Sequence, residues 1–252
     1  MVLTGEGADE TLGGYPWYMA NKILGPLAGW PVAARVAAAR GLAGRWPGAA
    51  QILTAPAEMN LERFHALIGS PGRNVPPDLF AFDGGERNEW RPPEAFHGWH
   101  PFVQLQYLDM KWRMADSVIA HVDLCSMAYS LEARVPFLDH VLVEFCATIP
   151  PWIKLRGLRE KHVLRRAMRG VLPAEICWRK KFGLSAPTRD LVAGLLPQLA
   201  GRANGWFNPS QVATLIAQHQ QGQANHSRLL LLIWTTQLWD ELFLKRFSCA
   251  TT

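Results

Sequence analysis

Apolar residues recur every three or four positions along most of the chain, which is the spacing of amphipathic helices. The helices that this pattern predicts fall at residues 16–46 (as two or three short helices), 57–68, 103–128, 139–147, 157–169, 188–201, 209–221 and 226–246. Residues 70–101 are rich in Pro, Gly, His and Trp without periodicity, and they predict a long irregular connection or a lid. A loop is predicted at Arg179–Leu184. The chain is therefore expected to be mostly α.

The first residues depart from this helical pattern. Val2 and Leu3 form a short apolar run that ends at Gly5-Glu6-Gly7, and a helical stretch follows. This order predicts a strand that ends in a turn and leads into a helix, the junction at which open α/β sheets usually place ligands. Because so short a strand is not a sheet and has no evident partner for its backbone groups, we expect a strand remnant.

Composition narrows the class of protein. The 252 residues, 49% of them apolar, suffice for one large domain or two small ones with a real core. No signal peptide is evident, and no charge-free apolar run approaches the roughly 18 residues that span a bilayer, so we expect a soluble, cytoplasmic protein without a membrane partner. The cysteines (Cys125, Cys146, Cys177 and Cys249) form no CxxC pair and are interpreted as buried reduced thiols.

The net charge of +5 fits either a nucleic-acid surface or a pocket for a polyphosphate anion. The tryptophans do not alternate with basic residues, so no nucleic-acid partner is expected. His97 and His100 lack a nearby cysteine or a helical partner, which argues against a metal site between them.

Two acids in the opening turn are the first candidates for chemistry. Glu6 and Asp9 lie three residues apart at the strand-to-helix junction, and Gly5 and Gly7 permit close backbone approach and positive φ. Carboxylates in this position could hold Mg²⁺ or act as a base. The alternative is that Asp9 caps the helix and Glu6 is solvated.

A cationic loop is the second candidate. Arg179, Lys180 and Lys181 precede Phe182-Gly183, and such a loop could close over phosphates and neutralise charge that develops in a transition state. The alternative is an ordinary solvated loop. The basic residues of 156–169 occupy the outer face of an amphipathic helix and are interpreted as structural.

Three stretches, taken together, resemble a known family. They are VLTGEGADE followed by GGYPWY, then ADSVIAHVDLCSMAYSLEARVPFLDH, then LREKHVLRRAMRGVLPAEICWRKKFGLSAPT. In order and spacing they resemble the C-terminal synthetase domain of glutamine-hydrolysing asparagine synthetases, over residues 1–18 and 104–190. The fold implied is the C-terminal helical part of an α/β ATP-pyrophosphatase domain, like that of adenine nucleotide α-hydrolases. The chain (1–252) would then be a partial domain, with an active-site strand, turn and helix at 1–18, an irregular connection at 70–101, the family core at 102–190 and C-terminal helices at 191–252.

The resemblance also implies an activity, namely ATP-dependent conversion of aspartate to asparagine through a β-aspartyl-AMP intermediate, with ammonia derived from glutamine. By motif, Thr4 and Gly5 lie where the family contacts the AMP portion, and Asp9 matches an acid that binds Mg²⁺. Glu6 matches the acid that removes a proton during ammonia attack, and Lys181 matches the loop lysine that stabilises the pentavalent phosphorus.

Two features of the family pattern are missing from these residues. No pyrophosphate loop of the form SGGxDS occurs, and no glutaminase domain with its N-terminal catalytic cysteine. In addition, Asp116-Ser117 stands where many relatives carry two acids. We therefore expect a chain that is inactive alone and needs the missing N-terminal segment in cis or in trans. The alternative is a non-catalytic helical binding or assembly module derived from the same family.

Overall fold

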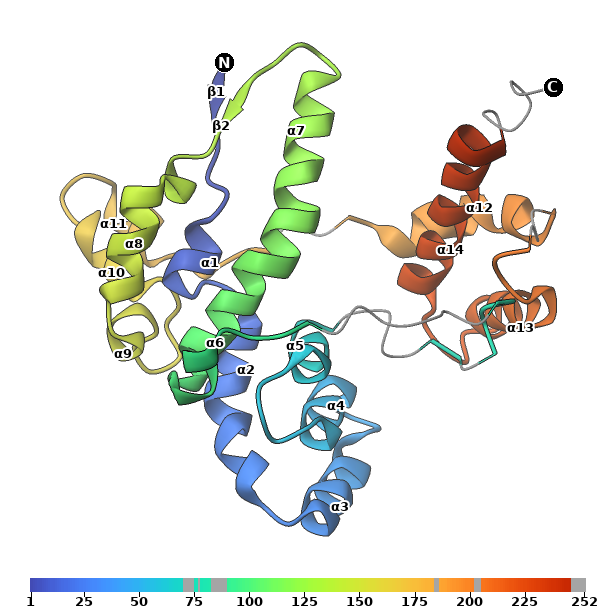
Figure 1. Cartoon of the computed structure of the whole chain (residues 1–252), viewed down its shortest axis with the longest axis horizontal. Coiled ribbons are helices and arrows are strands. Elements are labelled where there is room, and N and C mark those ends of the chain that lie inside the picture. The colour runs from blue at the N-terminus through green and yellow to red at the C-terminus, as the bar shows by residue number, and fades with distance from the viewer. Residues whose placement is uncertain (70–74, 77, 83–89, 184–185, 202–204, 246–252) are drawn as a thin grey trace. The chain divides into compact units, whose positions relative to one another are not determined.

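The computed structural model describes residues 1–69, 75–76, 78–82, 90–183, 186–201 and 205–245. This part of the chain is mostly helical, as the periodicity predicts (Figure 1). It divides into two compact units, the first made of residues 1–70 and 90–180 and the second of residues 71–89 and 181–252. The second unit is therefore assembled from two segments that lie far apart in the sequence.

The first unit contains two short strands and a series of mostly short helices. They are β1 (Val2–Leu3), α1 (Ala8–Leu12), α2 (Pro16–Leu24), η1 (Gly25–Gly29), α3 (Val32–Leu42), α4 (Pro47–Thr54), α5 (Leu61–Ile68), η3 (Glu94–Gly98), α6 (Pro101–Leu108), η4 (Asp109–Ile119), α7 (Ala120–Met127), β2 (Ala133–Arg134), η5 (Pro136–Leu138), α8 (His140–Thr148), α9 (Pro151–Lys154), α10 (His162–Ala167) and α11 (Ala174–Trp178). The predicted helices of 16–46, 103–128 and 139–147 are confirmed. Helices α4, α9 and α11 were not predicted.

The expectation of an unpaired strand remnant was wrong. Strand β1 pairs in parallel with β2, with Val2 opposite Ala133 and Leu3 opposite Arg134. The backbone N–H of Thr4 extends the ladder by donating to the carbonyl of Arg134 at 2.8 Å. The partner strand β2 ends next to Val135, whose non-helical backbone is favoured by the following Pro136. Sequence alone did not reveal that these two stretches, about 130 residues apart, meet.

One long helical rod runs through the first unit. Helix α6, the π-helical segment η4 and helix α7 follow one another without a break, and Figure 1 shows them as a continuous green ribbon. The α6 end is buried in the main core of this unit, whereas none of the α7 residues is buried. Leu124 and Met127 of α7 are 69% and 52% exposed.

Two predicted helices start later than expected. The helix expected from residue 57 begins at Leu61, because the side chain of Asn60 accepts a hydrogen bond from the N–H of Arg63 and caps it. The basic helix expected at 157–169 covers only His162–Ala167, since Lys161 has the left-handed φ of 48° and ends the preceding turn.

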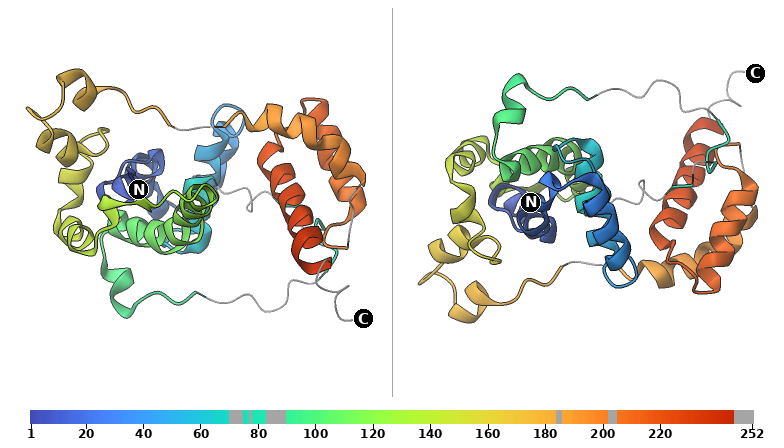
Figure 2. Two further views of the ribbon diagram at one scale, coloured as in Figure 1. Left: turned by 90° about the horizontal axis from the view of Figure 1, so that it is seen from above. Right: turned by 90° about the horizontal axis from the view of Figure 1, so that it is seen from below.

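The second unit is a small helical bundle, shown in orange and red in Figure 2. It consists of α12 (Thr188–Gly201), α13 (Pro209–Gln220), α14 (Ser227–Trp239) and the π-helical segment η6 (Asp240–Lys245), which confirms the helices predicted after residue 188. Residues 79–82 join this bundle, because Leu79 is fully buried in its core and Ala81 donates to the carbonyl of Trp206. Part of the predicted irregular connection at 70–101 is thus core of the second unit; residues 70–74, 77 and 83–89 lie outside the described residues.

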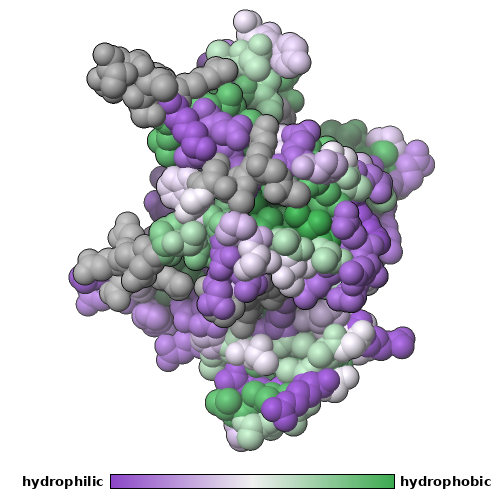
Figure 3. Space-filling view, turned by 90° about the vertical axis from the view of Figure 1, so that its right-hand side faces the viewer, coloured by the Kyte–Doolittle hydropathy of each residue, from purple (hydrophilic) through white to green (hydrophobic). Residues whose placement is uncertain are grey.

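The surface carries apolar side chains, visible as green atoms among purple hydrophilic ones in Figure 3. Cys146 and Cys177 are buried as predicted, but Cys125 on α7 is exposed, so that prediction was wrong; Cys249 lies outside the described residues. None of the helices in the described part of the chain has the length and apolarity needed to cross a bilayer.

Candidate active site

The GEGADE turn (residues 5–10) packs against the SLEARVPFLDH stretch (residues 130–140). Gly7 has the predicted positive φ, +89°, and forms the N-cap of α1. A Cβ on Gly7 would lie 2.4 Å from Cδ2 of Leu138, so the segment that follows β2 packs directly on the turn. The SLEARVPFLDH stretch therefore supports the GEGADE turn physically, through the β1–β2 pairing and through this contact.

Thr4, Gly5 and Glu6 lie together at the end of β1. The Oγ1 atom of Thr4 is buried and has no hydrogen-bond partner in the described part of the chain. A buried hydroxyl without a partner is costly, so this atom is available to a ligand. Gly5 has open space where a Cβ would stand, and Glu6 is half-buried.

Asp9 lies in the first turn of α1 but does not cap it, because Gly7 is the N-cap and no side-chain cap bond forms. The capping interpretation was therefore wrong. The Oδ1 atom of Asp9 lies 2.9 Å from Nζ of Lys161, and both side chains are about one fifth exposed (21% and 20%). A Cβ on Gly14 would lie 1.8 Å from Asp9 Oδ1 and 2.3 Å from Lys161 Cε, so glycine at position 14 makes room for the ion pair.

Lys161 was not among the predicted site residues. It was expected within a basic surface helix, whereas in the structure it precedes α10 and pairs with Asp9. Its backbone has the left-handed φ of 48°. No helical periodicity could have signalled it.

Glu10 anchors the far side of the turn. It is 1% exposed and forms an ion pair with Arg113, while the hydroxyl of Tyr15 donates to its Oε1 atom at 2.8 Å. Burial raises the pKa of the Glu10 carboxyl, and the Tyr15 hydrogen bond and the Arg113 charge lower it in part. Glu10 thus fixes α1 to the long rod and has no evident access to a substrate.

Asp109 completes this buried network from the start of η4. Its carboxylate accepts hydrogen bonds from Arg113 Nε at 2.6 Å and from the Tyr18 hydroxyl at 2.7 Å. Burial would lower the pKa of Arg113, but Asp109 more than offsets this and the pKa is raised. The guanidinium also lies over the rings of Tyr15 and Trp17, at 4.3 and 5.0 Å from their centroids. These contacts fix the GGYPWY stretch.

A second buried polar chain connects α1 to α9. The Gln106 amide donates to the carbonyls of Glu10 and Thr11, and its oxygen accepts from Lys154 Nζ at 3.0 Å. Lys154 is 2% exposed, and burial lowers its pKa to about 8, while the nearby Cys146 opposes the shift. The turn is therefore held by two buried networks that reach it from different helices.

The loop that carries Lys181 is anchored at its start. Arg165 donates from Nη1 to the carbonyls of Cys177, at 2.7 Å, and Arg179, at 3.0 Å, and it pairs with Glu160 at 2.7 Å. Arg179 and Lys180 belong to the first unit of the chain, whereas Lys181 belongs to the second unit. The structure thus brings Thr4, Gly5, Glu6 and Asp9 together, and the participation of Lys181 stays a prediction.

A divalent cation would have few protein ligands here. Among the described residues, no three His, Cys, Asp or Glu side chains gather closely enough to hold a metal. Mg²⁺ commonly binds through one or two carboxylates and the phosphates of a nucleotide, so Asp9 alone fits such a site.

These features define a helical protein with an acid-bearing strand-to-helix turn that buried networks hold rigid. The family model described as asparagine synthase matches residues 1–241. The chain therefore belongs to the asparagine synthase family, as the motifs predicted.

Individual relatives support this assignment. A putative glutamine-hydrolysing asparagine synthetase of Mycobacterium tuberculosis is 28% identical over 97% of this chain and 40% of its own length. Glutamine-hydrolysing asparagine synthetase 3 of Bacillus subtilis is 33% identical over 71% of this chain and 25% of its own length. An amidase, chry2, of Gibberella zeae is 28% identical over 77% of this chain and 33% of its length. This chain thus spans less than half of each of these relatives, and no solved structure matches it.

Proposed function

We propose that this chain supplies the C-terminal part of an ATP-dependent amide-forming site that converts aspartate to asparagine. The observation that carries the proposal is the turn at residues 4–9, where an unpartnered buried hydroxyl, Thr4 Oγ1, and two carboxylates, Glu6 and Asp9, lie at the end of a parallel strand. The asparagine synthetases among the relatives support the choice of reaction.

The first step is transfer of AMP to the aspartate side chain. A side-chain carboxylate oxygen attacks the α-phosphorus of ATP, a P–O bond forms, and pyrophosphate leaves to give β-aspartyl-AMP. Thr4 and Gly5 contact the AMP portion, and Lys181 stabilises the negative charge of the pentavalent phosphorus. Asp9 would hold a magnesium ion, which neutralises phosphate charge when bound.

Asparagine forms in the second step. Ammonia attacks the acyl carbon of β-aspartyl-AMP, a C–N bond forms, and AMP leaves. Glu6 accepts a proton from the attacking nitrogen, since its carboxylate is half-buried beside the residues that contact AMP. Ammonia would come from glutamine in a glutaminase domain.

The test is exchange of labelled pyrophosphate into ATP in the presence of aspartate and Mg²⁺. Because no SGGxDS loop occurs among these 252 residues, the assay uses the chain alone and the chain mixed with the N-terminal portion of a relative. We expect exchange only in the mixture. Exchange that does not depend on aspartate, or none in any mixture that forms a stable complex, would favour the non-catalytic assembly module.

Substitutions test the assigned residues in that mixture. We expect Glu6→Ala and Lys181→Ala each to lower asparagine synthesis at least about tenfold, and Lys181→Ala to lower the exchange as well. Lys180→Ala, one position away on the same loop, is the matched control and should keep its activity. Full activity in either of the first two variants would overturn the corresponding assignment.

A further inference from the structure

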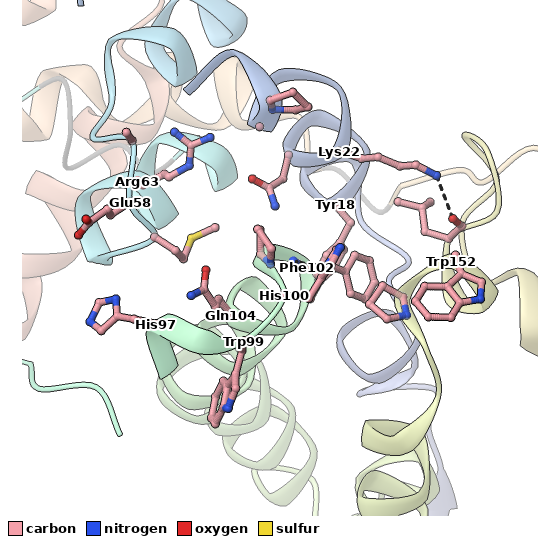
Figure 4. Close-up of a pocket in the computed structure, with 18 residues that line it drawn as sticks. Tyr18, Lys22, Glu58, Arg63, His97, Trp99, His100, Phe102, Gln104 and Trp152 are labelled. Carbon is pink, nitrogen blue, oxygen red and sulfur yellow. Dashed lines mark hydrogen bonds between the residues drawn. The ribbon is translucent and has the colours of Figure 1, made fainter. Parts of the chain in front are cut away.

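The first unit contains a cavity that the proposed reaction does not use. It encloses about 820 Å³ and lies among α2, the segment before α5, the start of α6, and α9. Figure 4 shows Glu58, Arg63 and His97 at one end and Lys22 and Trp152 at the other. Cavities of this size bind small organic molecules, commonly through apolar walls and a few polar groups.

The apolar walls suit a flat ring. Tyr18 and Phe102 line the middle of the cavity and belong to the main core of the unit. Leu155 and Met59, which belong to the same core, also line the cavity. Trp152 is 68% exposed and lines the end of the cavity near Lys22. An aromatic body could therefore lie against the buried rings of Tyr18 and Phe102 and contact the exposed indole of Trp152.

A buried cation without a counter-ion faces this cavity. Arg63 is 3% exposed and donates from Nη1 to the carbonyl of Pro56 at 2.8 Å, but it forms no ion pair within the described residues. Burial lowers its pKa, and so does repulsion from Arg35, which likewise is buried and bonded only to carbonyls. A buried charge is costly without an opposite charge, and Glu58, which lines the same end of the cavity, is exposed and forms no ion pair with Arg63.

Asn21 supplies a hydrogen-bonding group on the cavity wall. The residue is 6% exposed and lines the cavity, and its amide makes no side-chain hydrogen bond in the described part of the chain. The amide is therefore free to donate to a ligand in the cavity. A single anionic group in the cavity could pair with the Arg63 guanidinium and accept a hydrogen bond from the Asn21 amide.

We propose that this cavity binds a small carboxylic acid with an aromatic body. The carboxylate pairs with Arg63 and accepts from the Asn21 amide, while the ring lies against Tyr18 and Phe102. None of the residues assigned to the synthetase reaction lines this cavity, so the site is separate from the proposed synthetase site.

The test is binding of 4-phenylbutyrate to the full chain, measured by isothermal titration calorimetry without ATP or aspartate. Its neutral isostere, 4-phenylbutanamide, is the comparison, and we expect the carboxylate to bind at least about tenfold more tightly because it makes charge-assisted bonds. L-Aspartate should not displace it. Equal binding of the two probes, or no binding of either, would overturn the proposal.

Three variants locate the site. Arg63→Met should reduce the affinity for 4-phenylbutyrate to that for the amide, and Arg40→Met, an exposed arginine on α3, should leave both affinities unchanged. Because Arg63 also bonds to Pro56, its variant could fail to fold. Asn21→Leu removes no internal hydrogen bond and should weaken 4-phenylbutyrate binding severalfold; an unchanged affinity in this variant contradicts the site. All these readouts are independent of amide synthesis.

Discussion

Glycine 14 shows how one residue shapes the acidic turn. A methyl group at this position would meet Asp9 Oδ1 and Lys161 Cε, at 1.8 and 2.3 Å, so Gly14→Ala must push the paired side chains apart. We expect the variant to lose about 1 kcal/mol of unfolding free energy, measured by urea denaturation followed by circular dichroism.

The matched control is Gly48→Ala. Gly48 lies in the first turn of α4 and has nothing within 4 Å of the added Cβ, so alanine should leave the free energy of unfolding unchanged or raise it by up to about 1 kcal/mol. Equal stability of the two variants would show that the Asp9–Lys161 pair tolerates the methyl group.

Lys154 makes the stability of the protein depend on pH. Its pKa is lowered from 10.5 to about 8 by burial, so the unfolded chain binds its proton more tightly than the folded one. The free energy of unfolding should therefore rise as the pH rises from about 8 to about 10.5, by at most about 3 kcal/mol for this group.

Comparison with Lys154→Met isolates this contribution, because other groups titrate in the same range in both proteins. Urea denaturation at several pH values between 7.5 and 10 should give a steeper rise for the natural chain than for the variant. Parallel curves would mean that Lys154 keeps its ordinary pKa in the folded state.

At the level of single residues, the sequence predicted the acids of the turn but only part of their surroundings. Glu6 and Asp9 could be named as candidates because short glycine-flanked motifs indicate local geometry, and their roles stay predictions. The positive φ of Gly7 followed from its residue type. Lys161 could not be found, because the pairing with Asp9 joins residues 152 positions apart in the sequence. Glu10 and Arg113 escaped notice for the same reason.

Among the elements, α10 and α11 hold the start of the cationic loop. Arg165 joins them by bonding to the carbonyls of Cys177 and Arg179. Arg165→Met removes these hydrogen bonds, so the segment Arg179-Lys180-Lys181, which trypsin can cleave, should open more often. Limited trypsin proteolysis should then cut this segment about threefold faster or more.

Arg166→Met provides the control, since Arg166 is exposed on the same helix and its side chain forms no hydrogen bond or ion pair with the loop among the described residues. It removes one basic side chain without freeing the loop, so its cleavage rate should match that of the natural chain. A similar acceleration in both variants would indicate a general loosening of α10.

Helices were predicted better than their ends. Apolar spacing located the longer helices, because one buried face imposes a regular pattern. The starts at Leu61 and His162 depend on the Asn60 cap and on the left-handed Lys161, and the β1–β2 pair depends on chain segments meeting in space. Local periodicity carries none of this information.

At the scale of the whole molecule, the free end of the long rod is an apolar surface. Leu124 and Met127 lie three residues apart on α7 and are mostly exposed, and Tyr129 just beyond is 87% exposed. Exposed apolar clusters favour association, so the isolated chain should form larger species as its concentration rises, as light scattering after size-exclusion chromatography would detect.

Leu124→Glu should shift that equilibrium towards the monomer without changing the free energy of unfolding, because Leu124 is not part of a core cluster. Arg40→Glu, an exposed position on helix α3, is the surface-charge control and should leave the association unchanged. Identical elution of all three proteins at every concentration would rule out α7 as the contact.

The second unit is built from two segments that are far apart in the sequence, and this affects its folding during synthesis on the ribosome. Leu79 leaves the exit tunnel long before α12, α13 and α14, whose side chains bury it. At roughly 5–20 residues per second, translation of the intervening stretch takes on the order of ten seconds. During that interval the apolar segment around Leu79 stays exposed to solvent, so it is a target for the chaperones that bind nascent chains.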